Sequence, residues 1–167
     1  ICFIALRPML PNGSVEVKSS NFDIFFVVDN SISMDALDYN GENKRLDGVK
    51  NDIKYIMNEL PGSNYSLISY SYDAKIRVPL TYDVNTVLAS VKAITPPNLY
   101  NASGSKITGF KSELEVLLKN ASKKQDRKRI VFLFSDGENT TEDKLESLKS
   151  LDEFIDALPD RYDTIVG

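Results

Sequence analysis

Hydrophobic residues along this chain occur in two patterns: short unbroken runs, and longer stretches in which apolar positions recur every three or four residues. Unbroken runs are typical of strands that are buried on both faces, and the spaced stretches are typical of helices with one buried face. Strands are predicted over residues 15–17, 23–29, 65–72, 75–78, 129–135 and 162–166. Helices are predicted over residues 46–60, 83–94, 110–118 and 145–158.

The order of these elements predicts the fold class. Strands that alternate with helices are typical of α/β domains with a doubly wound, mainly parallel sheet and helices on both faces. Pro79 cannot donate a backbone hydrogen bond to a neighbouring strand, so we expect the strand over residues 75–78 to form one antiparallel edge of the sheet. Asp83 is predicted to cap the next helix. The inner face of that helix is predicted to carry Val84, Val87, Leu88 and Val91.

The length of 167 residues is sufficient for one domain with a substantial core, and we assign this domain to residues 15–167. The chain opens with six apolar residues and does not begin with methionine. Six residues cannot cross a bilayer, which takes about 20 in helical form. We therefore expect residues 1–14 to be either the end of a transmembrane helix or a packed terminal segment. Because a final buried strand would be left partly uncovered, we also expect the natural protein to continue beyond residue 167.

Composition excludes several function classes. The chain has no histidine, which rules out Ser-His-Asp and Cys-His catalysis and histidine-based zinc sites, and its single cysteine, Cys2, rules out an intrachain disulfide. A net charge of −4 disfavours binding to nucleic acid or to anionic lipid. A cluster of basic residues is interpreted as a solvated helix end rather than as a binding patch. It consists of Lys123, Lys124, Arg127, Lys128 and Arg129.

Oxygen-bearing side chains follow two of the predicted buried strands. Asp29, Ser31 and Ser33 end the first, and Asp136 ends the strand over residues 129–135. Ligands bind at the carboxyl ends of strands in open α/β sheets, and hard divalent cations such as Mg²⁺ prefer oxygen ligands. If the two strands are neighbours, these oxygens share one metal site. Since hydroxyls are neutral ligands, the cation would keep much of its charge, which suits capture of an external carboxylate better than hydrolysis.

Each of these residues also has a purely structural interpretation. Ser31 and Ser33 could be helix-cap or turn residues, and Asp136-Gly137 could be an ordinary turn after a strand. Their joint presence at two strand ends favours a binding site. The polar loop that follows Ser33 does not have the spacing of an EF-hand, and we interpret it as a solvated rim. Its polar residues are Asp35, Asp38, Asn40, Glu42 and Asn43.

The stretch Asp29-Asn-Ser31-Ile-Ser33 resembles the DxSxS signature of von Willebrand factor type A (vWA) domains, which have a Rossmann-like fold. Ser135-Asp136-Gly137-Glu138 resembles the second metal-site element of that family, and the resemblance extends from about Val15 to Val166. Shorter segments are similar to bacterial membrane-anchored proteins of the aerotolerance (Bat) type. These are Ala5-Leu6-Arg7-Pro8, Asn43-Lys44-Arg45-Leu46 and Val78-Pro79-Leu80-Thr81.

The resemblance implies a metal-ion-dependent adhesion site (MIDAS) that holds Mg²⁺, Mn²⁺ or Ca²⁺. By that analogy Ser31 and Ser33 bind the ion directly, while Asp29 and Asp136 act directly or through water. The family places a threonine in the loop before the helix over residues 110–118. Here Ser105 fits by register and Thr108 by residue type, so both are candidates.

The implied partner of this site is a protein that presents Asp or Glu to the bound ion. No nucleic acid is expected as a partner. The resemblance also places the domain outside the cytoplasm of a bacterium, tethered to the membrane by flanking segments.

Two other functions fit part of the pattern. A Mg²⁺-dependent phosphoryl-transfer hydrolase would use Asp29 as its nucleophile, but such enzymes have an acid two positions later, where this chain has Ser31. A scaffold with a vestigial metal site would explain the irregular Ser105/Thr108 element. We therefore expect a binding module rather than an enzyme.

Overall fold

The computed structural model describes residues 2–3, 22–39, 41, 43–98, 109–122, 127–136, 149–150, 152–154 and 165–166. Its strands are β1 (Cys2–Phe3), β2 (Phe22–Asp29), β3 (Asn64–Tyr70), β4 (Ala74–Thr81), β5 (Lys128–Phe134) and β6 (Ile165–Val166). Its helices are the 3₁₀ helix η1 (Ile32–Asp35) and the α-helices α1 (Arg45–Glu59), α2 (Val84–Lys92) and α3 (Lys111–Ser122). Residues 149–150 and 152–154 are helical as well, within the helix predicted over residues 145–158.

The main sheet has the strand order β4-β3-β2-β5. β2 pairs in parallel with β3 on one side and with β5 on the other, whereas β4 pairs antiparallel with β3. Among the described strands, β4 is therefore an edge strand, as Pro79 predicts. The mainly parallel, doubly wound α/β fold with one antiparallel edge strand is confirmed.

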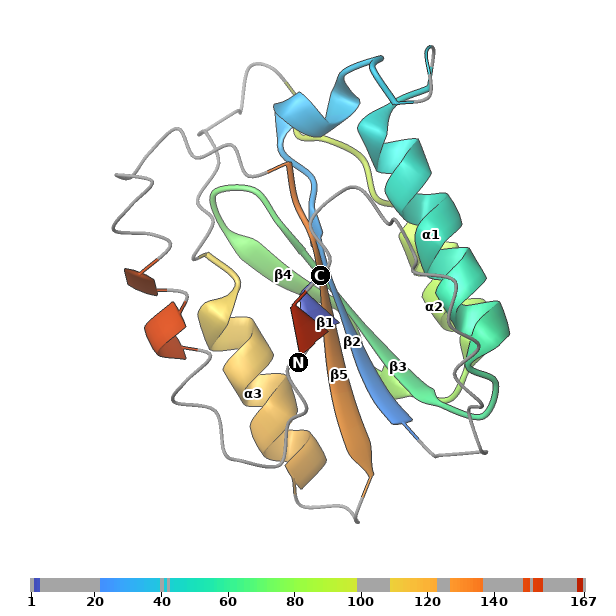
Figure 1. Cartoon of the computed structure of the whole chain (residues 1–167), viewed down its shortest axis with the longest axis vertical. Helices are drawn as coiled ribbons and strands as arrows, with labels where there is room; N and C mark the ends of the chain where they lie inside the picture. The colour runs from blue at the N-terminus through green and yellow to red at the C-terminus, as the bar shows by residue number, and fades with distance from the viewer. Residues whose placement is uncertain are drawn as a thin grey trace.

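Helices cover both faces of this sheet, with α1 and α2 on one side and α3 on the other (Figure 1). β2 explains why both layers form. Ile24, Phe26 and Val28 pack into the core beneath α1 and α2, while Phe25 and Val27 pack into the core beneath α3. Side chains alternate between the faces of a strand, so a strand covered on both faces must be apolar at every position. Burial on both faces therefore explains the unbroken apolar run of β2.

The ends of some elements differ from the predictions. β4 extends through Pro79 to Thr81, beyond the predicted residue 78. Asp83 caps α2 as predicted, since its side chain accepts hydrogen bonds from the backbone of Asn85 and Thr86. The prediction for Val84 is wrong: its residue is 40% exposed, because the first helical position after the cap faces solvent. Val87 and Val91 are buried as predicted.

Two terminal predictions have partial outcomes. The last strand exists as β6, but it pairs in parallel with β1 in a separate two-stranded sheet instead of joining the main sheet. The strand predicted over residues 15–17 lies outside the described residues. Among the helices that the structure describes, none has the length and the apolar content needed to cross a membrane.

The interpretation of the basic cluster as a solvated helix end is wrong for its described arginines. Arg127 donates from Nε to Oδ1 of Asp23 at 2.7 Å, and Asn64 donates to the same carboxyl oxygen at 2.8 Å. Asp23 is only 2% exposed, so Arg127 neutralises a buried charge. Arg129 is 6% exposed and donates to the carbonyl of Ala121 at 3.0 Å. Both arginines fix the start of the β2–β5 pair to its surroundings.

Candidate metal site

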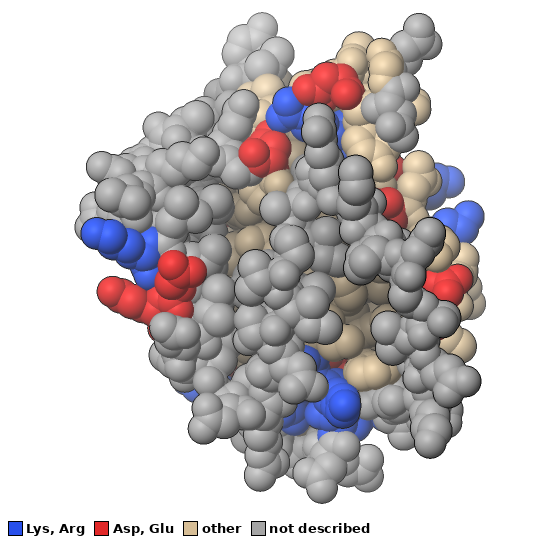
Figure 2. Space-filling model, in the orientation of Figure 1, with Lys and Arg blue, Asp and Glu red and all other residues tan. Residues whose placement is uncertain are grey.

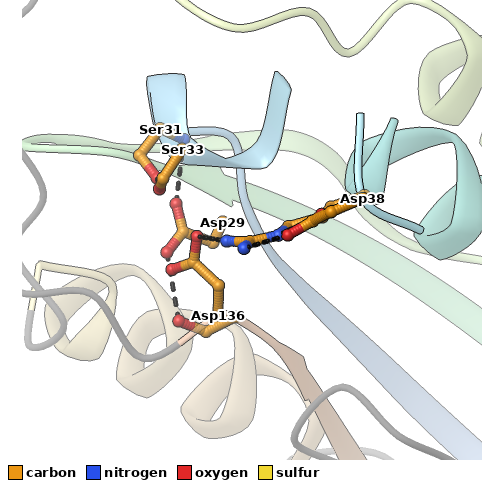
Figure 3. A network of polar contacts seen from close by, with 7 residues as sticks. Asp29, Ser31, Ser33, Asp38 and Asp136 are labelled. Carbon is orange, nitrogen blue, oxygen red and sulfur yellow. Dashed lines mark hydrogen bonds and ion pairs between the residues drawn. The ribbon is translucent and has the colours of Figure 1, made fainter. Parts of the chain in front are cut away.

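The site lies at the carboxyl ends of β2 and β5, which the parallel register brings together. Val28 of β2 lies opposite Phe134 of β5, so the next residues, Asp29 and Ser135, face each other. Ser135 Oγ donates to Oδ2 of Asp29 at 3.1 Å. Figure 3 shows the side chain of Asp136 close to that of Asp29. The structure thus brings together the two acids that the sequence predicts as one site.

The turn after β2 positions two hydroxyls beside Asp29 (Figure 3). The backbone N–H of Ser31 donates to Oδ1 of Asp29 at 2.8 Å, which fixes the turn. Ser31 occupies the N-cap position of η1, but its side chain makes no capping hydrogen bond. Instead, the Oγ atoms of Ser31 and Ser33 form a hydrogen bond with each other at 2.9 Å. The helix-cap interpretation therefore does not account for these hydroxyls.

The separation of the two hydroxyl oxygens is that of a hydrogen bond, and it also matches the spacing of two ligands of one cation. Two neighbouring ligands of one octahedral Mg²⁺, each at about 2.1 Å, lie about 3.0 Å apart. Within the described residues, no three Asp, Glu or Cys residues cluster as a metal site. A cation at this edge of the sheet would accordingly be held by neutral hydroxyls together with Asp29 and Asp136.

Burial governs the ionisation of Asp29, whose residue has no exposed surface. Desolvation raises the pKa of Asp29 to about 6, although hydrogen bonds from Ser31 and Ser135 oppose that rise, and the nearby charge of Asp136 adds to it. The buried Tyr70 hydroxyl lies in the same region, where desolvation and the charge of Asp29 raise the pKa of Tyr70 well above its ordinary value. Burial and the neighbouring charge of Asp136 thus both disfavour the ionised form of Asp29.

One positive side chain does reach the site. Arg45, the first residue of α1, donates from Nη1 to Oδ2 of Asp136 at 2.9 Å. The same guanidinium donates from Nε and Nη2 to the two carboxyl oxygens of Asp38, at 2.8 and 2.5 Å. These bonds raise the pKa of Arg45 above its ordinary value and lower the pKa of Asp38. Arg45 therefore joins the loop after β2 to the end of β5.

The described residues of the rim make specific contacts, while Asn40 and Glu42 lie outside the described residues. Lys44 pairs with Asp35 at 2.6 Å, and Tyr39 and Asn43 form a short antiparallel bridge. Asp38 is exposed and Asp35 is partly exposed, but both are in ion pairs, so the interpretation as a merely solvated rim is incomplete. On the face drawn in Figure 2, acidic and basic side chains lie next to each other at the end of the molecule that carries this rim.

The remaining candidates lie elsewhere in the chain. Ser105 and Thr108, the two candidates for the last ligand, lie outside the described residues, as do Gly137 and Glu138. Sequence reasoning missed Ser135 as a partner of Asp29 and treated Arg45 only as part of a short resemblance. One feature of the sequence could have revealed Arg45. Two adjacent positive residues, Lys44 and Arg45, stand at the start of a helix, where negative charge is favoured.

Comparisons with known proteins agree on the fold. The family described as von Willebrand factor type A domain matches residues 24–138. A search of curated proteins finds no match. Among solved structures, BatB from Bacteroides thetaiotaomicron is similar with a TM-score of 0.67 and 22% identity, over 88% of this chain and 65% of that one. An aerotolerance-related membrane protein from Bacteroides fragilis has a TM-score of 0.65 and 20% identity, over 88% of this chain and 66% of that one.

A third similar structure is proximal thread matrix protein 1 of the mussel byssus, solved with zinc in its MIDAS motif. Its TM-score is 0.61 at 17% identity, over 88% of this chain and 35% of that protein. At these identities the likeness shows the fold. The chain spans about two thirds of the two Bacteroides proteins.

The raised pKa of Asp29 predicts a pH dependence of stability in the metal-free protein. The folded chain binds this proton more tightly than the unfolded chain, whose Asp pKa is near the ordinary value of 3.8. The contribution of Asp29 to the free energy of unfolding should therefore fall as pH rises from about 4 to above 6, by about 2–3 kcal/mol. Denaturant unfolding in EDTA at several pH values measures it, and Asp29→Asn should lack this decrease.

Asp73→Asn, at an exposed acid in the turn between β3 and β4, is the matched control and should follow the wild-type profile. A wild-type profile in Asp29→Asn would show that this carboxyl is not the titrating group.

Proposed function

Because the chain belongs to the von Willebrand factor type A domain family, we propose that it is a protein-binding module that captures an acidic side chain of its partner through a bound divalent cation. The observation that carries this proposal is the convergence of Asp29, the Ser31–Ser33 hydroxyl pair and Asp136 at one edge of the sheet. Mg²⁺ is the cation we propose, with Mn²⁺ and Ca²⁺ as alternatives, since all three accept oxygen ligands.

The chain's residues divide the work of this site. Ser31 and Ser33 offer neutral oxygens, so a bound cation keeps charge with which to attract an external carboxylate. Asp29 fixes the hydroxyl turn through the N–H of Ser31 and supplies negative charge from a buried position. Asp136 supplies the second charge. Ser105 or Thr108 would add the last hydroxyl.

A binding function fits these residues better than catalysis. With no histidine in the chain and a serine two positions after Asp29, the described site has no general acid for phosphoryl transfer. The similar structures named above include proximal thread matrix protein 1 of the mussel byssus with zinc in its MIDAS motif, which supports a metal-dependent role without assigning a partner.

We propose further that the domain is held at a bacterial membrane, outside the cytoplasm. Support comes from the likeness to an aerotolerance-related membrane protein of Bacteroides fragilis.

Removal of one hydroxyl tests the metal site. Ser33→Ala deletes a ligand oxygen without adding charge, and we expect it to weaken Mg²⁺ and Mn²⁺ binding at least about tenfold in isothermal titration calorimetry. Ser71→Ala is the matched control, because Ser71 follows the neighbouring parallel strand β3 at the same edge of the sheet, and it should bind as the wild type does. Equal affinities for wild type and Ser33→Ala would refute the assignment.

The same titration distinguishes the two candidates for the last ligand. If Ser105 completes the site, Ser105→Ala should weaken Mg²⁺ binding about tenfold, while Thr108→Ala should stay close to the wild type. The reverse result would move the ligand to Thr108. Thermal unfolding in EDTA, where both variants should match the wild type, controls for a general loss of structure.

Capture of a carboxylate is tested with a displayed library of random peptides selected on the immobilised chain in Mg²⁺. Selected peptides should contain Asp or Glu, and their binding should be lost in EDTA or after replacement of that residue by Asn or Gln. The physical reason is that an amide carries no charge to match the cation. Peptides that bind equally well in EDTA would contradict metal-dependent capture.

A further inference from the structure

Arg45 stands at the junction of the candidate site and its rim. Its guanidinium contacts Asp136 through Nη1, and it contacts both oxygens of Asp38 through Nε and Nη2. The side chain of Asp136 is 6% exposed, whereas that of Asp38 is 55% exposed and that of Arg45 is 26% exposed. One cation therefore bridges a buried acid of the site and an acid on the surface.

Arg45 is the first residue of α1, a position where negatively charged side chains are favoured. The N-terminus of a helix carries a partial positive charge, so Lys44 at the N-cap and Arg45 at the first helical position are both disfavoured there. Lys44 offsets this through Asp35 on the exposed rim. Arg45 instead depends on the acid of the site itself, and on Asp38. Its placement is explained by the charges of Asp38 and Asp136 and not by the helix.

We propose that Arg45 is an internal competitor of the divalent cation: it pairs with Asp136 in the metal-free protein, releases Asp136 when the ion binds, and thereby keeps the affinity for metal low. This inference rests on the metal-binding function proposed above. It assigns Arg45 as the residue that sets the strength of the site, a role that the ligand residues alone do not define.

The contacts of Arg45 allow such an exchange. Asp38 holds the guanidinium through two parallel hydrogen bonds, the strongest geometry for an Arg–carboxylate pair. The bond to Asp136 is single. When a divalent cation takes over the charge of Asp136, Arg45 keeps its two bonds to Asp38 at the exposed rim and needs no new partner. Repulsion between the guanidinium and the ion opposes binding as long as Arg45 stays close.

The experiment compares Mn²⁺ and Mg²⁺ affinities of the wild-type chain with those of Arg45→Gln and Lys44→Gln by titration calorimetry. Both substitutions remove one positive charge at adjacent positions, but only Arg45 contacts the site. Arg45→Gln should bind metal about tenfold more tightly, the size of effect that one neighbouring charge has on an ionisation equilibrium. Lys44→Gln, and Arg45→Lys with its retained charge, should remain within about threefold of the wild type.

Unchanged or weaker metal binding by Arg45→Gln overturns the role of Arg45 and leaves the proposed function intact if the wild type binds metal. Absence of metal binding in both proteins overturns the proposed function together with this inference. A readout on the unmodified chain covers the case in which Arg45→Gln does not fold. The ¹⁵N-NMR signal of Arg45 Nη1, the nitrogen that donates to Asp136, should shift with the same midpoint as Mg²⁺ binding, and an unchanged signal at saturating Mg²⁺ overturns the inference.

Discussion

Parallel pairing of β2 with its two neighbours is the constraint on which the candidate site depends. Parallel strands end at the same edge, so the β2–β5 register that places Val28 opposite Phe134 necessarily places Asp29 opposite Ser135 and brings Asp136 beside them. The same pairing leaves every residue from Ile24 to Val28 fully buried between two helical layers. Rigid, dry strands thus deliver two acids to one point, where water cannot freely solvate them.

Two ionised carboxyl groups this close together repel each other unless their charge is balanced. The raised pKa of Asp29 and its hydrogen bonds from Ser31 and Ser135 reduce this cost. The charge of Asp136 is balanced by Arg45. A divalent cation would satisfy both acids at once and would add the Ser31 and Ser33 oxygens as ligands. In the proposal made above, the metal and the arginine are alternative ways to balance the charge of Asp136, and the balance between them sets the affinity of the site for metal.

The sequence predicted what depends on local pattern. Unbroken apolar runs indicated the buried strands, Pro79 indicated the edge, and Asp83 indicated a helix start, because each acts within its own segment. The exposure of Val84 and the burial of Arg129 were not predicted, because hydropathy alone does not show on which face a residue at the end of an element lies. Arg45 and Arg127 escaped for another reason: their carboxylate partners Asp136 and Asp23 are 91 and 104 residues away, so only the folded chain brings the charges together.

The two arginine–aspartate pairs at opposite ends of this sheet show why only one of them fits an exchangeable site. At the start of β2, Asp23 is 2% exposed and is bound by both Arg127 and Asn64, with no hydroxyl pair among the contacts described for it. That pair is closed, and breaking it would leave a buried charge without compensation. At the other end, Arg45 already shares its charge with the exposed Asp38, and Ser31 and Ser33 offer neutral oxygens beside the acids. In the exchange that we propose, a divalent cation replaces Arg45 at Asp136 while Arg45 stays paired with Asp38, so neither charge is left without a partner. The Arg127–Asp23 pair offers no such exchange, which is why we propose a metal site at only one of the two ends.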